Sequence, residues 1–215
     1  NNYKDGWFYF DGRLNLSDFV ENNSSINNFK KKLLNKNKLN KSSKILVLRE
    51  QGVGDEILYG TIYGDLLESC ENVSIECDIR LKKIFRNSFP KYQASFVNFG
   101  EISSDKNLLN SFDFALYAGS LGKFFRNKIE DFKSGHYLYP DNKLVDEYKK
   151  QFNKYKNKKN IGLSWKSFKN RYAKEKSLAL EDFKYLFDTK NCNFINLQYG
   201  EVEKEIYDYN KKFDK

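Results

Sequence analysis

The stretch ILVLREQGVGDEIL, residues 45–58, decides the fold expected for this chain. It opens with a short apolar run that includes β-branched residues, as in a buried strand of a parallel sheet. Gly52 and Gly54 then predict a tight backbone turn that lets a ligand come close. Asp55 and Glu56 follow where a helix would begin, and helix starts favour negative charge. This order indicates an α/β sheet that binds a ligand at the carboxyl ends of its strands.

The composition favours packed domains without metal or disulfide chemistry. The chain has 215 residues, is 40% hydrophobic, and contains three cysteines and one histidine. Such a length allows one large or two small domains. Scattered cysteines without CxxC spacing indicate buried thiols in a reducing compartment, so we expect a cytoplasmic protein. A single histidine leaves little for zinc binding or a serine-type triad, and we expect no metal site.

The net charge of +9 comes mostly from lysine, which is spread along the chain. Arginines are not clustered with stacking aromatic residues, so we expect no nucleic-acid partner. No apolar run approaches the ~20 residues that a membrane-spanning helix needs, so we expect no transmembrane segment. The chain contains no methionine. We therefore expect a fragment whose first residue is not the natural start.

The periodicity divides the chain into three regions. Residues 1–43 are expected to be the end of a helical, repeat-like region with a linker, 44–155 a first α/β domain with a connecting helix, and 156–215 the start of a second. Strands are expected at 45–49, 73–77, 95–99, 112–117, 161–165 and 194–198. Helices are expected at 29–39, 55–69, 78–89, 143–155 and 180–187, and from 201 onward.

The last region supplies only two strands, which is few for a freestanding parallel sheet. Its apolar residues need partners that the sequence does not contain. We therefore expect an incomplete second domain, and a fragment that is inactive alone and associates through residues 160–215.

Six motifs occur in a characteristic order: EQGVGDEIL (50–58), IECDIRLKKIFRNSFP (75–90), YAGSLGKFFR (117–126), GHYLYPD (135–141), GLSWKS (162–167) and NLQYG (196–200). Together they resemble the heptosyltransferase-like glycosyltransferases at the carboxyl end of bacterial tetratricopeptide-repeat proteins. The resemblance covers roughly residues 44–207, and GWFYFDGRL near the start resembles the tail that joins repeats to such a domain.

The resemblance implies the GT-B architecture, in which two Rossmann-like domains face each other. It implies transfer of a sugar from a nucleotide-diphosphate donor to a hydroxyl of a glycan or protein, by an inverting route. No cofactor is implied beyond this donor substrate, and a repeat region would precede the domain in the full-length protein. By position, Asp55 matches the aspartate that acts as general base. Glu50, Gln51, Gly52 and Gly54 fall on the acceptor side.

The second domain would hold the donor phosphates. The residues that fall there are Trp165, Lys166, Ser167, Arg171, Lys176, Ser177 and Gln198. Cations and helix amides suit a diphosphate leaving group. The sequence does not decide which of the basic residues makes the contact.

Each of these assignments has an alternative. Asp55 also fits a simple helix cap, and the basic loop 166–177 also fits a solvated surface. VLREQGVGDE resembles the turn of S-adenosylmethionine methyltransferases as well, with Glu76 as the ribose acid, but Glu56 replaces the third glycine and the second βα pattern is unexplained. A non-catalytic interaction module with a transferase fold also stays open. Glu76 and His136 are expected to be structural.

Overall fold

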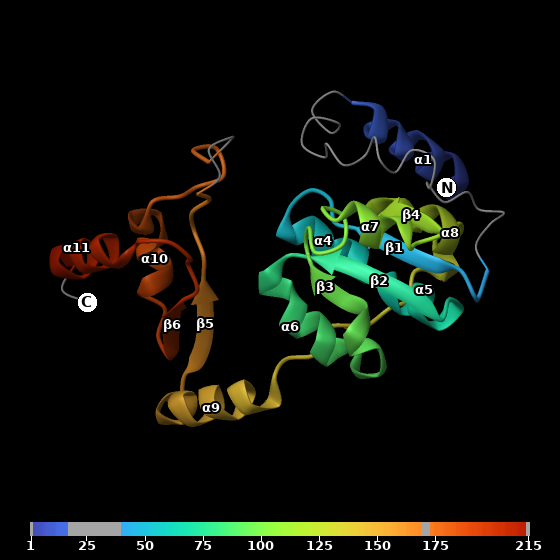
Figure 1. Ribbon diagram of the computed structural model, residues 1–215. Helices are drawn as coiled ribbons and strands as arrows, with labels where there is room; N and C mark the ends of the chain where they lie inside the picture. The colour runs from blue at the N-terminus through green and yellow to red at the C-terminus, as the bar shows by residue number, and fades with distance from the viewer. Residues whose placement is uncertain (1, 17–39, 169–172, 214–215) are drawn as a thin grey trace. The chain divides into compact units, whose positions relative to one another are not determined.

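The computed structural model describes residues 2–16, 40–168 and 173–213 (Figure 1). The chain divides into two compact units, Asn1–Asn142 and Lys143–Lys215. The helix expected over 29–39 lies outside the described residues. No helix in the described part of the chain is long and apolar enough to cross a membrane.

The first unit is built on a four-stranded parallel sheet. Its strands are β1 (Lys44–Leu48), β2 (Asn72–Cys77), β3 (Phe96–Asn98) and β4 (Phe114–Tyr117), in the order β3-β2-β1-β4 (Figure 1). In the register, Ile45 lies opposite both Val73 and Phe114. The α/β fold with a parallel sheet is thus confirmed. Because β2 and β4 lie on opposite sides of β1, the order in which successive strands are added to the sheet reverses between β1 and β4, the point where such sheets bind ligands.

Helices cover both faces of this sheet. They are α4 (Val53–Gly60), α5 (Tyr63–Ser69), α6 (Ile79–Ser88), α7 (Lys106–Asn110) and α8 (Gly122–Phe125), with short 3₁₀ turns η4 (Pro90–Ser95), η5 (Ala118–Leu121) and η6 (Ile129–Asp131). One core contains Ile45, Tyr63 and Phe85. A second core, around Leu46 and Tyr117, packs on other residues of the same strands. Alternate residues of β1 therefore enter the two cores, as a parallel sheet covered on both faces requires.

The single helix expected over 55–69 is wrong, because the chain forms α4 and α5 instead. The N–H groups of Thr61 and Ile62 donate to the carbonyls of Leu58 and Tyr59, three residues earlier. These shorter-range bonds end the α-helical pattern at this point.

The N-terminal segment belongs to the first unit and packs on the rest of it. It consists of α1 (Tyr3–Phe10) and the 3₁₀ turn η1 (Asp11–Asn15). The indole N–H of Trp7 donates to the carbonyl of Arg126 at 2.6 Å. The Trp7 ring lies so close to Gly122 that a Cβ there would be 2.5 Å from it. Glycine at this position therefore lets α1 dock against α8.

The second unit has two parallel strands, β5 (Lys159–Leu163) and β6 (Cys192–Asn196), with Ile161 opposite Phe194 (Figure 1). Around them lie α9 (Asn142–Phe152), η7 (Asn153–Tyr155), η8 (Leu180–Phe183), α10 (Lys184–Phe187) and α11 (Glu203–Phe213). Each strand begins and ends two residues before its expected range. Trp165 falls outside β5 because its N–H donates to the side chain of Gln198 and not to a strand.

Candidate functional site

Asp55 lies in the first turn of α4, just after the loop that follows β1. Its Oδ2 atom accepts a 2.9 Å hydrogen bond from the backbone N–H of Gly52. None of the residues that the structure describes donates a hydrogen bond to its other oxygen, Oδ1. A Cβ at Gly54 would meet no other atom within 4 Å. One carboxylate oxygen is therefore anchored as a helix cap, while the other remains available as a proton acceptor.

The turn between β1 and α4 is made by Gln51, which has a left-handed φ of 61°. Gly52 has a φ of −102°, a value open to any residue, and Gly54 is helical. The expectation that the two glycines make the turn is therefore wrong. The Tyr59 hydroxyl donates to Gln51 Oε1 at 2.9 Å. Burial and then the carboxylate of Glu50 raise the pKa of Tyr59 to about 12, so this hydroxyl stays protonated.

Glu50, assigned to the acceptor side from the sequence, has an exposed fraction of 2%. Its carboxylate accepts hydrogen bonds from Nε and Nη2 of Arg13, at 2.9 Å and 2.7 Å. It also accepts one from the backbone N–H of Gly119. Glu50 follows β1 and Gly119 follows β4. The carboxylate therefore joins the two loops at the point where the strand order of the sheet reverses.

Arg13 and Asp11 of the N-terminal segment complete this polar cluster, and sequence analysis missed both. Arg13 Nη2 donates to the Ser120 hydroxyl at 3.1 Å, and Lys123 Nζ lies 2.7 Å from Asp11 Oδ2. Burial raises the pKa of the Asp11 carboxyl, but hydrogen bonds from Lys123, Ser120 and Arg13 outweigh it, so the net shift is downward. The one signal in the sequence is a pair of charged residues within an otherwise aromatic stretch.

A second cluster that sequence analysis missed lies at the ends of β1 and β2. Arg49 contacts both Glu56, through Nε, and Asp78, at 3.2 Å. The buried Glu56 carboxylate also accepts the N–H of Asp78 at 2.9 Å. Burial raises the pKa of Glu56 even though Arg49 opposes the shift. Hydrogen bonds from Arg80 hold the pKa of Asp78 well below its ordinary range. These charges fix the loops beside α4.

The two residues expected to be structural differ in their surroundings. Glu76 is fully buried and accepts hydrogen bonds from the N–H groups of Ile102 and Ser103, at 2.9 Å and 2.7 Å. It also accepts the Ser103 hydroxyl at 2.8 Å, so its structural role is confirmed. His136 is exposed, and its ring centroid lies 5.1 Å from that of Tyr139.

In the second unit, Gln198 organises the loop that follows β5. Its Oε1 accepts the backbone N–H groups of Trp165 and Lys166, both at 2.7 Å. Its Nε2 donates to the carbonyls of Lys166 and Tyr199. The N–H of Ser167 donates to the Ser177 hydroxyl at 3.0 Å. The structure thus brings these predicted residues together, and the side chains of Gln198 and Ser177 already accept the backbone N–H groups of the loop.

The predicted basic residues of this unit lie in unlike surroundings. Lys166 Nζ is 2.6 Å from Glu205 of α11. Burial opposes ionisation of Glu205, but hydrogen bonds from Lys166 and Trp165 lower its pKa overall. Lys176 is exposed and has no carboxylate partner among the described residues. Arg171 lies outside the described residues.

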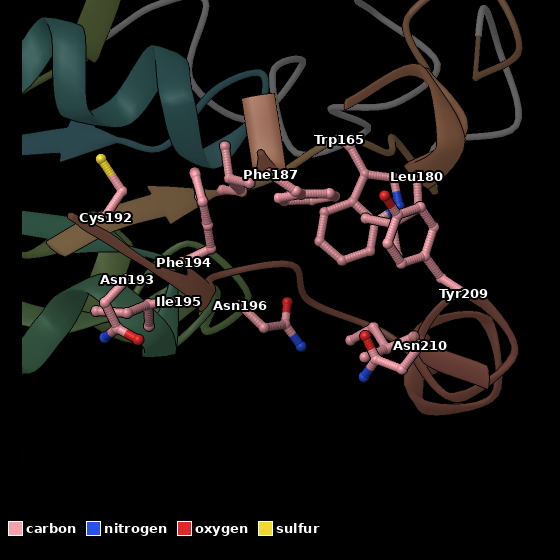
Figure 2. A pocket seen from close by; sticks show the side chains of 12 residues that line it. Trp165, Leu180, Phe187, Cys192, Asn193, Phe194, Ile195, Asn196, Tyr209 and Asn210 are labelled. Carbon is pink, nitrogen blue, oxygen red and sulfur yellow. The ribbon is translucent and has the colours of Figure 1, made fainter. Parts of the chain in front are cut away.

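A cavity of about 430 Å³ lies beside β6 of the two-stranded sheet (Figure 2). It is lined by Leu163, Trp165, Leu180, Phe187, the five residues of β6, Ile206, Tyr209 and Asn210. In Figure 2, β6 runs along one side of the cavity, with Trp165, Leu180 and Tyr209 at the other. The lining is mostly apolar and contains no ionised side chain. The cavity therefore has no cationic side chain in its lining that could bind a diphosphate.

Within the described ranges, no cluster of His, Cys, Asp and Glu has the composition and geometry to hold a metal ion.

Comparison with known proteins gives one relative. Over 178 residues the chain is 26% identical to Protein FlbA of Caulobacter vibrioides, a match that covers 77% of this chain and 30% of that protein. The chain thus spans about 30% of the length of the curated relative that it matches. No protein-family model matches the chain. No solved structure gives a significant match.

Proposed function

We propose that this chain is part of a glycosyltransferase of the GT-B type. It would transfer a sugar from a nucleotide-diphosphate donor to an acceptor hydroxyl, with Asp55 as the general base. The observation that carries the proposal is the carboxylate of Asp55. Its Oδ2 is held by Gly52 while no described residue donates to Oδ1. The carboxylate also lies near the carboxyl end of β1, where parallel sheets bind their ligands.

In the proposed reaction, Oδ1 of Asp55 takes the proton of the acceptor hydroxyl. The acceptor oxygen forms a bond to the anomeric carbon as the bond from that carbon to the diphosphate breaks. The nucleoside diphosphate leaves with the electron pair, and the configuration at the sugar inverts. A positioned base typically contributes about 10²–10⁴ in rate.

For the donor diphosphate we favour Lys176 over Lys166. Lys166 is already paired with Glu205 at 2.6 Å, so a phosphate would have to compete with a carboxylate. Lys176 has no such competitor among the described residues. A cation without an internal partner gains more from an incoming diphosphate, because binding breaks no existing ion pair.

Two observations disfavour the methyltransferase alternative. Glu76 would have to bind a ribose, but both oxygens of its carboxylate already accept hydrogen bonds from Ile102 or Ser103. The carboxylate of Glu50, at the end of β1, is also already bound by Arg13 and by the N–H of Gly119 at the end of β4. The non-catalytic alternative would leave Asp55 as a cap only.

Calorimetry on the full-length protein tests the donor class. The ligands are UDP, GDP, ADP and dTDP, with S-adenosylhomocysteine as the rival. We expect one diphosphate to bind, with an affinity that falls as salt rises, and Lys176→Met to weaken binding about tenfold or more. The matched control is Lys190→Met, which removes the same charge next to the amino end of β6. Binding of S-adenosylhomocysteine without any diphosphate would contradict the proposal.

A further inference from the structure

The N-terminal segment reaches the loops at the carboxyl ends of β1 and β4. Arg13 is largely buried, with 9% of its side chain exposed, and its partner Glu50 has none. Two guanidinium nitrogens contact the two oxygens of Glu50, which is the bidentate arrangement that only arginine offers. Nη1 of Arg13 also donates to the carbonyl of Phe10 at 3.1 Å, so the guanidinium is held from its own segment as well.

From these contacts we propose that Arg13 is a positioning residue for Asp55, acting through Glu50 and the loop that joins them. The inference rests on the proposed function, because Asp55 needs a fixed position only if it acts on a substrate. The same N-terminal segment that resembles a connecting tail would then be an integral part of the acceptor side of the site.

The path from Arg13 to Asp55 is short. Glu50 is followed by Gln51, which is held in its left-handed conformation with its side chain accepting from Tyr59. Gly52 comes next, and its N–H is the group that anchors Oδ2 of Asp55. A shift of Glu50 would therefore move the peptide group of Gly52, whose N–H anchors the carboxylate of Asp55.

Loss of Arg13 would force such a shift. Glu50 would retain the N–H of Gly119 but lose its only described cationic partner. A buried carboxylate without a compensating charge is strongly unfavourable, so it would move toward water or take up a proton. Lysine would keep the positive charge but could not contact both oxygens in the same plane. The two substitutions thus separate the charge of Arg13 from its geometry.

Hydrogen exchange and turnover of the full-length protein test the inference together. The variants are Arg13→Lys and Arg13→Met, with Lys123→Met as the matched control. Lys123 holds the same N-terminal segment through Asp11 but does not contact Glu50. Turnover is followed as hydrolysis or transfer of UDP-, GDP-, ADP- and dTDP-sugars.

We expect faster exchange of the amides of residues 50–56 in both Arg13 variants and not in Lys123→Met. We expect kcat to fall about tenfold in Arg13→Lys and about 10²-fold in Arg13→Met, as misplacement of a reacting group by about 1 Å can cause. The KM for the donor should stay within about twofold, because Arg13 acts on the acceptor side. If Arg13→Met does not fold, Arg13→Lys alone carries the comparison.

Unchanged exchange over 50–56 in the Arg13 variants overturns the inference. Equal effects of Lys123→Met overturn it too, because Arg13 would then only help to dock the segment. The exchange readout needs no substrate. If the wild-type protein turns over none of the sugars, the proposed function fails, whereas exchange still decides whether Arg13 positions the loop.

Discussion

Strands β1 and β5 each open the α/β pattern of their unit but differ in burial. Each is a short run with apolar residues, followed by a loop and a helix. Four of the five residues of β1 are buried, and none of β5 is. β1 lies between β2 and β4, with a core on each face, whereas β6 is the one strand that pairs with β5 among the described residues. An apolar pattern therefore predicts a strand, but its neighbours decide whether that strand is buried.

The largest difference between the two strands should appear in the loss of stability when a leucine side chain is shortened to alanine. Leu46 in β1 is fully buried, so Leu46→Ala should cost about 2–5 kcal/mol in the free energy of unfolding of the first unit. Leu163 in β5 is only partly buried. The same substitution there should cost the second unit less than about 2 kcal/mol, because less apolar surface leaves contact. Hydrogen exchange of peptides from each unit measures both, and equal losses would refute the comparison.

Both units have buried polar side chains that organise loops, among them Glu50 in the first and Gln198 in the second, and removal of either should act locally. Gln198→Ala removes the acceptor of two backbone N–H groups, those of Trp165 and Lys166. We expect the second unit to lose about 1–3 kcal/mol, the cost of leaving buried donors unpaired. Fluorescence of Trp165 during urea unfolding, in a Trp7→Phe background, reports on this unit. A matching loss of exchange protection in β1 would show that the units are not separate.

The smallest expected effect concerns pH. The pKa of Asp11 is lowered in the folded state, so its ion pairs stabilise docking of the N-terminal segment above the ordinary aspartate pKa. As pH falls below about 4, the unfolded state binds the proton first and this stabilisation is lost, by less than about 1 kcal/mol for a partly exposed group. Trp7 fluorescence in a Trp165→Phe background should follow this loss. Asp11→Asn should remove the pH dependence, and persistence in that variant would assign it to other groups.

Sequence patterns predicted the backbone of the first unit well and its polar contacts poorly. The run around Ile45 is typical of a buried parallel strand, and the structure confirms it. Contacts between Arg13 and Glu50 could not be predicted, because 37 positions separate them and no local pattern links them. The turn was predicted at Gly52 and Gly54 because glycine adopts a positive φ without steric cost, but Gln51 adopts it, and its side chain accepts a hydrogen bond from Tyr59. In the second unit, the predicted strand included Trp165 because its side chain is apolar. No sequence pattern shows that its backbone N–H pairs with the side chain of Gln198.

The two units also offer a matched pair of aspartates. Asp55 caps α4 by accepting the N–H of Gly52 at 2.9 Å, and Asp182 caps η8 by accepting the N–H of Ala179 at 2.8 Å. Asparagine at either position keeps an oxygen that can accept this hydrogen bond but cannot act as a base. Both substitutions should therefore change stability by similar small amounts, about 1 kcal/mol or less.

Turnover of the nucleotide sugar by these two variants tests the central claim most directly. If Asp55 is the general base, Asp55→Asn lowers kcat by about two or more orders of magnitude with nearly unchanged donor affinity, while Asp182→Asn keeps the wild-type rate. Near-normal turnover by Asp55→Asn would contradict the account and leave Asp55 as a helix cap, equivalent to Asp182.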